Sequence, residues 1–245
     1  MTPLLTKTDI IKQLQKVIIS MQGGAMSGNS QRLITGLGPI EQAFPNRSFP
    51  TGAIHELISH TREDAAPTNG FIAGLLSPLM RKDGICLWVS NKRTIFPPAL
   101  KLMGIEPDKV IFIDLTKPKD VLWVIEEGLK CNAVAAVVGE LQELSFTESR
   151  RLQLAVEESR VTGFIHRHQP RSENAVACVA RWKITSLPGI TTGGLPGVGH
   201  PRWNIQLAKA RNGKPGMWQV EWADNSFRFI SRNIALPEIQ TLKAG

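Results

Sequence analysis

Two kinds of apolar pattern alternate along the first two thirds of the chain. Predominantly apolar runs of strand length occupy residues 53–58, 85–89, 109–114, 133–138 and 161–166, and those at 85–89 and 133–138 are continuous. Apolar residues at helical spacing lie between the runs, at 71–80, 119–130 and 146–156. Continuous runs are typical of strands covered on both faces, and helices between strands favour parallel pairing. The sequence therefore predicts an α/β protein with a mostly parallel sheet flanked by helices.

The pattern changes after Gln169. Residues 175–185 alternate with the period of a strand, which places Arg181 and Lys183 on one face. Two more alternating segments, 202–207 and 217–222, flank a turn. They predict antiparallel strands at the C-terminal end. Their tryptophans share one face, and core packing is favoured over base stacking because polar residues already define the other face.

The N-terminus predicts an amphipathic helix followed by a flexible linker over residues 23–30. The apolar stripe of this helix comprises Ile10, Ile11, Leu14, Val17 and Ile18. The expected organisation is a helix and linker over 1–30, one domain over 31–232, and a tail over 233–245. The helix can dock on its own domain or on a partner, including a second copy, and the sequence leaves both open.

Charge is distributed unevenly. The net charge of +8 arises entirely from residues 150–245, which carry 14 Lys and Arg against 6 Asp and Glu. Such asymmetry indicates a polyanion, DNA or RNA first, or an acidic protein surface; a solvated basic face is the alternative. The candidate contacts are Arg167, His168, Arg171, Arg181, Lys183, Arg202, Arg211 and Lys214.

The three cysteines, Cys86, Cys131 and Cys178, are scattered, with no paired spacing and no histidine cluster. They predict free thiols in a reducing compartment, neither disulfides nor metal ligands. The chain shows no signal peptide and no membrane-spanning run. We therefore expect a cytoplasmic protein.

The loop after the first strand is where many α/β proteins bind phosphate. Here, residues 59–70 lack the glycine-rich lysine motif, and Arg62 stands beside two acids. The position of a nucleotide loop is kept without its chemistry, so no cofactor, no metal and no catalysis are expected. The residues of this vestigial site are Ser59, Arg62, Asp64, Thr68, Gly70 and Glu140.

An ordered set of segments resembles the ImuA family of RecA-like proteins. The segments are Phe49–Leu57, Leu87–Val89, Arg150–Ala155, Ala180–Ile184, Arg202–Leu207 and Arg211–Trp222. The resemblance implies a RecA-like core and an accessory role in SOS-induced, error-prone translesion synthesis. It also implies three partners: an ImuB-like homologue of Y-family polymerases, a replicative-type error-prone polymerase, and RecA. The cell-division inhibitor SulA is a related, shorter branch.

The same resemblance aligns the phosphate loop of RecA with Ser59–Gly70 and its second DNA-binding loop with the shorter Arg167–Glu173. We therefore expect a non-catalytic scaffold that docks proteins, with DNA as a further candidate. Two alternatives remain open. One is a degenerate ATPase that uses Glu140 and Asp114, and the other is a SulA-like inhibitor of the division GTPase.

Overall fold

The structure is a computed structural model, and it describes residues 35–80, 84–190 and 199–231. The chain divides into two units, Met1–Arg32 and Leu33–Gly245, and only the second contains described residues. The expected N-terminal helix, its linker and the C-terminal tail lie outside the described residues and stay predictions. No helix in the described segments is long and apolar enough to cross a bilayer.

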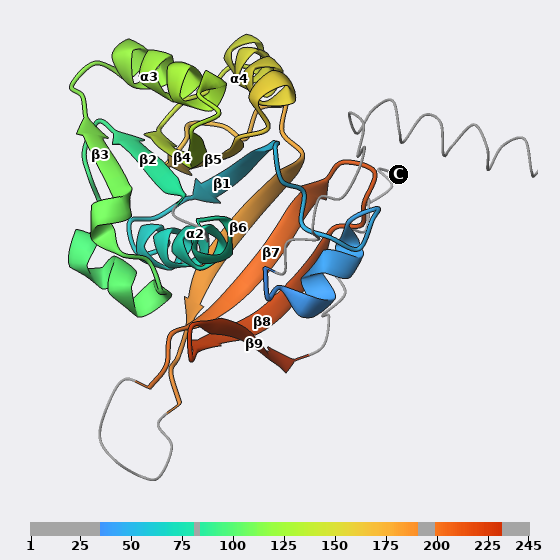
Figure 1. The fold of residues 1–245 in the computed structure, drawn as a ribbon. Coiled ribbons are helices and arrows are strands. Elements are labelled where there is room, and N and C mark those ends of the chain that lie inside the picture. Colours follow the sequence, from blue (N-terminus) through green and yellow to red (C-terminus); the bar gives the residue numbers. More distant parts are fainter. Residues whose placement is uncertain (1–34, 81–83, 191–198, 232–245) are drawn as a thin grey trace, which may run out of the picture. The chain divides into compact units, whose positions relative to one another are not determined.

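A single nine-stranded sheet dominates the described chain, in the order β3-β2-β4-β5-β1-β6-β7-β8-β9 (Figure 1). The first six strands pair in parallel: β1 (Ile54–Ser59), β2 (Ile85–Ser90), β3 (Val110–Asp114), β4 (Val134–Leu141), β5 (Thr162–His168) and β6 (Ala180–Leu187). The last three pair antiparallel: β7 (Arg202–Ala210), β8 (Gly216–Ala223) and β9 (Ser226–Ser231). The predicted fold class is confirmed, and β9 is a strand that the sequence patterns did not predict.

Helices cover the two faces of the sheet differently. On one face lies α2 (Ala65–Leu79), whose apolar residues join a core with the inner sides of β6 to β9. On the other face, α3 (Pro118–Lys130) and α4 (Phe146–Ser159) cover the parallel strands (Figure 1). Three 3₁₀ helices complete the described chain: η1 (Gly38–Ala43), η2 (Pro97–Met103) and η3 (Pro107–Lys109).

Local chemistry explains where the two outer helices begin and which face they bury. The side chain of Ser145 caps α4 and forms a reciprocal capping box with Glu148. The buried stripe of α3 comprises Val121, Ile125 and Leu129, three to four residues apart as a helix requires. These helices therefore follow from signals that the sequence displays.

The start of α2 corrects a prediction. The expected loop 59–70 ends at Asp64, because α2 already begins at Ala65, with Pro67 in its first turn. Gly70 therefore lies inside the helix, where an added Cβ would stand 2.8 Å from Trp203 Cζ2. Its lack of a side chain permits close packing on the antiparallel strands and has no part in binding phosphate.

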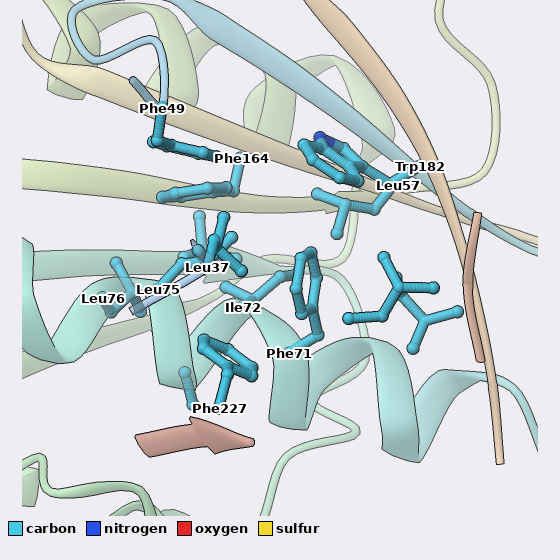
Figure 2. Packing of buried hydrophobic residues seen from close by; sticks show 14 of the residues in the cluster. Leu37, Phe49, Leu57, Phe71, Ile72, Leu75, Leu76, Phe164, Trp182 and Phe227 are labelled. Atoms are coloured by element: carbon cyan, nitrogen blue, oxygen red, sulfur yellow. The ribbon is translucent and has the colours of Figure 1, made fainter. Parts of the chain in front are cut away.

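Aromatic side chains fill the space between α2 and the sheet (Figure 2). Phe71 of α2 packs between Trp182 of β6 and Phe227 of β9, with ring centroids 5.5 and 5.6 Å apart. Trp203 and Trp218 are only 4% exposed. The preferred interpretation of the tryptophan face as core is confirmed, and no room remains for these rings to stack on bases.

Candidate functional site

Buried polar side chains gather where parallel strands β1, β4 and β5 end, the edge at which open α/β sheets bind ligands. We call this set the strand-end cluster. Its members come from β1, α2, the segment after β2, β4 and β5, and all but the exposed Thr94 are less than 6% exposed. The members are Ser59, Thr68, Asn69, Thr94, Glu140 and His166.

A directed chain of hydrogen bonds runs through the cluster. His166 Nε2 lies 2.7 Å from Ser59 Oγ, and its Nδ1 lies 2.9 Å from Asn69 Oδ1. Asn69 Nδ2 donates to Thr94 Oγ1 at 3.0 Å, and Thr94 Oγ1 donates to Glu140 Oε2 at 3.2 Å. An amide oxygen only accepts, so His166 carries its proton on Nδ1 and accepts the Ser59 hydroxyl at Nε2. The polar side chains at the strand ends therefore satisfy one another.

Glu140 is the acid nearest to the position that a magnesium-binding carboxylate would take, but its carboxylate is bonded to other side chains. It lies inside β4, not after it, and is 2% exposed. Trp88 Nε1 donates to its Oε1 at 2.7 Å. His168 Nε2 approaches its Oε2 at 3.2 Å, without the geometry of a hydrogen bond. Among the described residues, no group of three side chains is placed to hold a metal ion.

Backbone N–H groups of the β1–α2 loop donate hydrogen bonds to other atoms of the same loop. Thr61 N donates to Asp64 Oδ2 at 3.3 Å, and Asp64 N donates to Thr61 Oγ1 at 3.2 Å. Ala65 N donates to the carbonyl oxygen of Arg62 at 3.2 Å, and Pro67 has no N–H to offer. A phosphate loop needs several N–H groups that converge on the ligand. In this loop, three of the N–H groups are instead bonded within the loop itself.

Asp114, the second acid considered for metal chemistry, is held by neighbours at the end of β3. Ser90 Oγ and Arg93 Nη2 donate to its carboxylate at 2.9 and 2.5 Å. Burial acts in the opposite direction, but these hydrogen bonds hold the pKa of Asp114 below its ordinary value. Asp114 and Glu140 therefore have separate partners and do not share a site.

Ser59, His166 and Asn69 stand in the order of a nucleophile, a base and an orienting group, an arrangement that no sequence motif indicated. Ser59 and His166 are both 0% exposed. The Ser59 hydroxyl also lies 3.0 Å from Thr68 Oγ1, inside the helix-to-strand contact. A nucleophile needs space for a substrate beside it, so the burial of this trio indicates a structural role.

The comparisons with known proteins agree with this geometry. No family model matches the chain. Protein ImuA of Caulobacter vibrioides, found in two strains, is 30% identical over 224 residues, which cover 84% of this chain and 91% of that protein. The chain belongs to the ImuA family.

Two further similarities place this ImuA-family chain among known folds. The cell division inhibitor SulA of Serratia marcescens is 28% identical over 122 residues, which cover 48% of this chain and 69% of SulA. The RadB recombinase structure superposes with a TM-score of 0.57 at 14% identity, covering 81% of this chain and 100% of RadB. The second similarity concerns the fold alone and confirms a RecA-like core.

One predicted DNA contact of the ImuA-family chain is corrected by its burial. Arg167 is 0% exposed, and its Nη1 donates to Glu56 Oε1 at 2.9 Å. Its Nη2 donates to Glu143 Oε2 at 3.3 Å and to the carbonyl oxygen of Ser172 at 3.1 Å. A cation that is fully buried among acceptors cannot reach a phosphate, so Arg167 holds the β5–β6 connection to the sheet instead.

Other predicted contacts are exposed only in part and lie beside acids. Arg181 Nε lies 2.5 Å from Glu56 Oε2, and Lys183 Nζ lies 2.5 Å from Glu173 Oε1. The shared face predicted for Arg181 and Lys183 agrees with these contacts. Arg202 is half-buried, with its Nε 3.9 Å from Glu221. Their charges are therefore largely compensated inside the protein.

The remaining predicted contacts do not form one patch. The His168 ring lies tilted against that of His166, with 3.8 Å between ring centroids, and Arg171 is exposed in the β5–β6 connection. Arg211 and Lys214 are exposed in the turn between β7 and β8. Arg62 is exposed in the β1–α2 loop, apart from the strand-end cluster. The predicted basic surface is thus divided between the carboxyl ends of the parallel strands and a distant turn.

Glu56 is the buried residue that the sequence interpretation missed. It is 0% exposed in a strand, yet it accepts from two arginines and lies 3.8 Å from Cys178 Sγ. An acid inside a buried strand needs cationic partners. That rule could have paired Glu56 with arginines on neighbouring strands.

We predict that Glu56→Gln lowers the free energy of unfolding by about 3–5 kcal/mol, because it leaves the buried Arg167 with only the half-exposed Glu143 as a charged partner. Urea denaturation at neutral pH measures the change. The exposed Glu157→Gln serves as the matched control and is expected to shift stability by less than about 0.5 kcal/mol. Equal stability of the two variants would contradict this account of Arg167.

Two buried histidines predict acid sensitivity. Burial lowers the pKa of His55 to about 4, against a weaker opposing effect of the Pro50 carbonyl. Burial also holds the pKa of His166 well below its ordinary value, and the nearby His168 lowers it further. Each imidazole binds fewer protons folded than unfolded, so its stabilising effect is present above pH 6.5 and lost as pH falls toward the folded pKa.

We expect the unfolding free energy to fall by about 2 kcal/mol between about pH 7 and pH 5 from His55 alone, with His166 adding to the loss. Urea titrations across this range test it. His55→Gln should be less stable at neutral pH and less sensitive to acid, whereas the exposed His200→Gln should keep the original slope. An unchanged slope in His55→Gln would refute this assignment.

Proposed function

We propose that this ImuA-family chain is a non-catalytic RecA-like accessory protein of SOS-induced translesion synthesis. The observation that carries the proposal is the strand-end cluster, in which polar side chains at the ligand-binding edge of the sheet hydrogen-bond to one another. A RecA-like fold without a nucleotide site keeps its surfaces for docking and loses its means of hydrolysis. The family relationship supports the cellular process, and the cluster supports the absence of ATP chemistry.

The outer face of α3 and α4 supports the docking of a protein partner. Trp123 of α3 is 60% exposed, Leu154 of α4 is 51% exposed, and Phe146 at the start of α4 is 57% exposed. The charges beside them are paired, since Arg151 donates to Glu126 across the two helices. Exposed aromatic side chains on a charge-balanced surface are typical of interface cores.

The partner we propose for this face is the ImuB-like polymerase homologue. It belongs to the same process by family resemblance, and an apolar, uncharged contact fits a lasting protein assembly better than a polyanion. The N-terminal segment with Ile10 and Leu14 is proposed to serve assembly as well. A replicative-type polymerase and RecA remain partners of the assembled complex, in the cytoplasm.

A SulA-like role is the second candidate, favoured by the similarity to SulA over about half of the chain. The chain extends well beyond the region that matches SulA, and the described part of that extension contains elements of its own. A polymerisation assay with the division GTPase separates the two candidates. Inhibition at equimolar amounts would favour the SulA-like role.

We predict that Trp123→Ser weakens capture of the purified ImuB-like homologue by roughly 30-fold or more, the loss of about 2 kcal/mol typical of a buried interface tryptophan. Surface plasmon resonance with the full-length chain measures the affinity. Leu102→Ser is the matched control, because Leu102 is 71% exposed on η2, which lies with α2 on the opposite face of the sheet. Deletion of residues 1–30 tests the N-terminal segment separately.

Unchanged affinity of Trp123→Ser would remove the α3–α4 face from the proposal. No capture by the unmodified chain would overturn the scaffold function itself.

A further inference from the structure

The stretch between Glu173 and Glu221 contains no acidic residue and carries six Lys and Arg residues. Three of them, Arg181, Lys183 and Arg202, lie beside carboxylates of the protein. The other three lie at the turn from β7 to β8, are exposed, and form no ion pair within the described chain. We call them the turn cations: Lys209, Arg211 and Lys214.

The backbone of this turn is fixed by its neighbours. Arg211 N donates to the carbonyl oxygen of Val179 at 2.7 Å, and Lys214 N donates to that of Ala43 at 2.8 Å. Gly213 packs so closely that an added Cβ would stand 2.3 Å from the same Ala43 oxygen. A turn held in place loses little backbone entropy when a ligand binds.

The turn cations lie away from the strand-end cluster. In the antiparallel pairing of β6 and β7, Lys209 lies opposite Arg181, the second residue of β6. The turn therefore stands at the end of the sheet where the parallel strands begin (Figure 1). Lys209 Nζ donates to the carbonyl oxygen of Val176 at 3.2 Å. Lys209 and Arg211 flank the last residue of β7, so both stand at this turn.

The chemistry of the turn favours phosphate over a protein surface. None of the large exposed hydrophobic side chains of the described chain belongs to β7, β8 or the turn. A protein interface needs an apolar core, whereas contact with a phosphate backbone needs cations and no base recognition. The tryptophans of these strands are buried and leave the bases uncontacted.

We propose that the turn cations bind the phosphate backbone of DNA without sequence preference. The site lies opposite the sheet edge that carries the strand-end cluster. The choice of DNA as the polyanion rests on the proposed function, while the choice of phosphate rests on the turn itself. Three phosphate contacts predict a log–log salt slope of about −2.7 for duplex DNA and about −2.1 for single strands.

The test is fluorescence anisotropy of the full-length chain with labelled oligothymidylate and with a labelled duplex, from about 50 to 200 mM salt. The variant combines Lys209→Gln, Arg211→Gln and Lys214→Gln. We expect at least a roughly 10-fold loss of affinity at the lowest salt and a salt slope reduced by 2 to 3. Circular dichroism of the variant checks that it is folded.

A matched control removes the same charge at the other edge of the sheet. It combines Lys92→Gln, Lys117→Gln and Lys119→Gln, all exposed in the segments after β2 and β3. We expect the control to keep at least half of the original affinity and the full salt slope.

Equal losses in the two variants would show a general charge effect and overturn the inference. Binding of polyglutamate by the unmodified chain without binding of DNA would overturn it in favour of an acidic protein partner. Capture of the ImuB-like homologue is measured in parallel. If capture persists while DNA binding fails, only this inference falls; if capture fails, the proposed function fails independently.

Discussion

The buried polar groups at the carboxyl edge of this sheet need partners, and most of them find one in another side chain. In a nucleotide-binding protein of this topology, a ligand and a metal meet these groups. Here the imidazole of His166 bridges Ser59 and Asn69, and the chain continues to Glu140. Hydrogen bonds among these side chains stabilise the carboxyl edge of the sheet.

A second set of paired side chains lies on the other face of the same strands. Glu56 on β1 binds Arg167 on β5 and Arg181 on β6, and Glu143 and Glu173 hold the connection between those two strands. Some of the arginines and lysines that make the C-terminal part basic therefore form ion pairs within the protein. Two surfaces are left for the proposed contacts: the face of α3 and α4 with exposed apolar side chains, and the basic turn after β7.

Much of the fold followed from periodicity, because the strands and outer helices each carry a local signal. The buried run of β4, the stripe of α3 and the alternating tryptophans of β7 and β8 were assigned correctly in type. The predicted start of α2 is too late. Gly70 suggests a loop in the sequence, but in the fold it packs against Trp203, which lies far along the chain. Arg167 and Glu56 are 111 positions apart in the sequence, and they meet because β1 and β5 are adjacent strands of the sheet. Sequence spacing alone cannot supply such pairs. The missing glycines and lysine of the β1–α2 loop are visible in the sequence, but the hydrogen bonds among Ser59, Asn69 and His166 are not.

Isothermal titration of the full-length chain with magnesium-ATP tests the central claim most directly. The account predicts no saturable heat up to millimolar nucleotide, because the loop after β1 lacks the glycines and lysine that bind phosphate and the polar groups from Ser59 to Glu140 bond to one another. A single site with micromolar affinity would contradict it, since the cluster would then have to open for a ligand that the fold has retained.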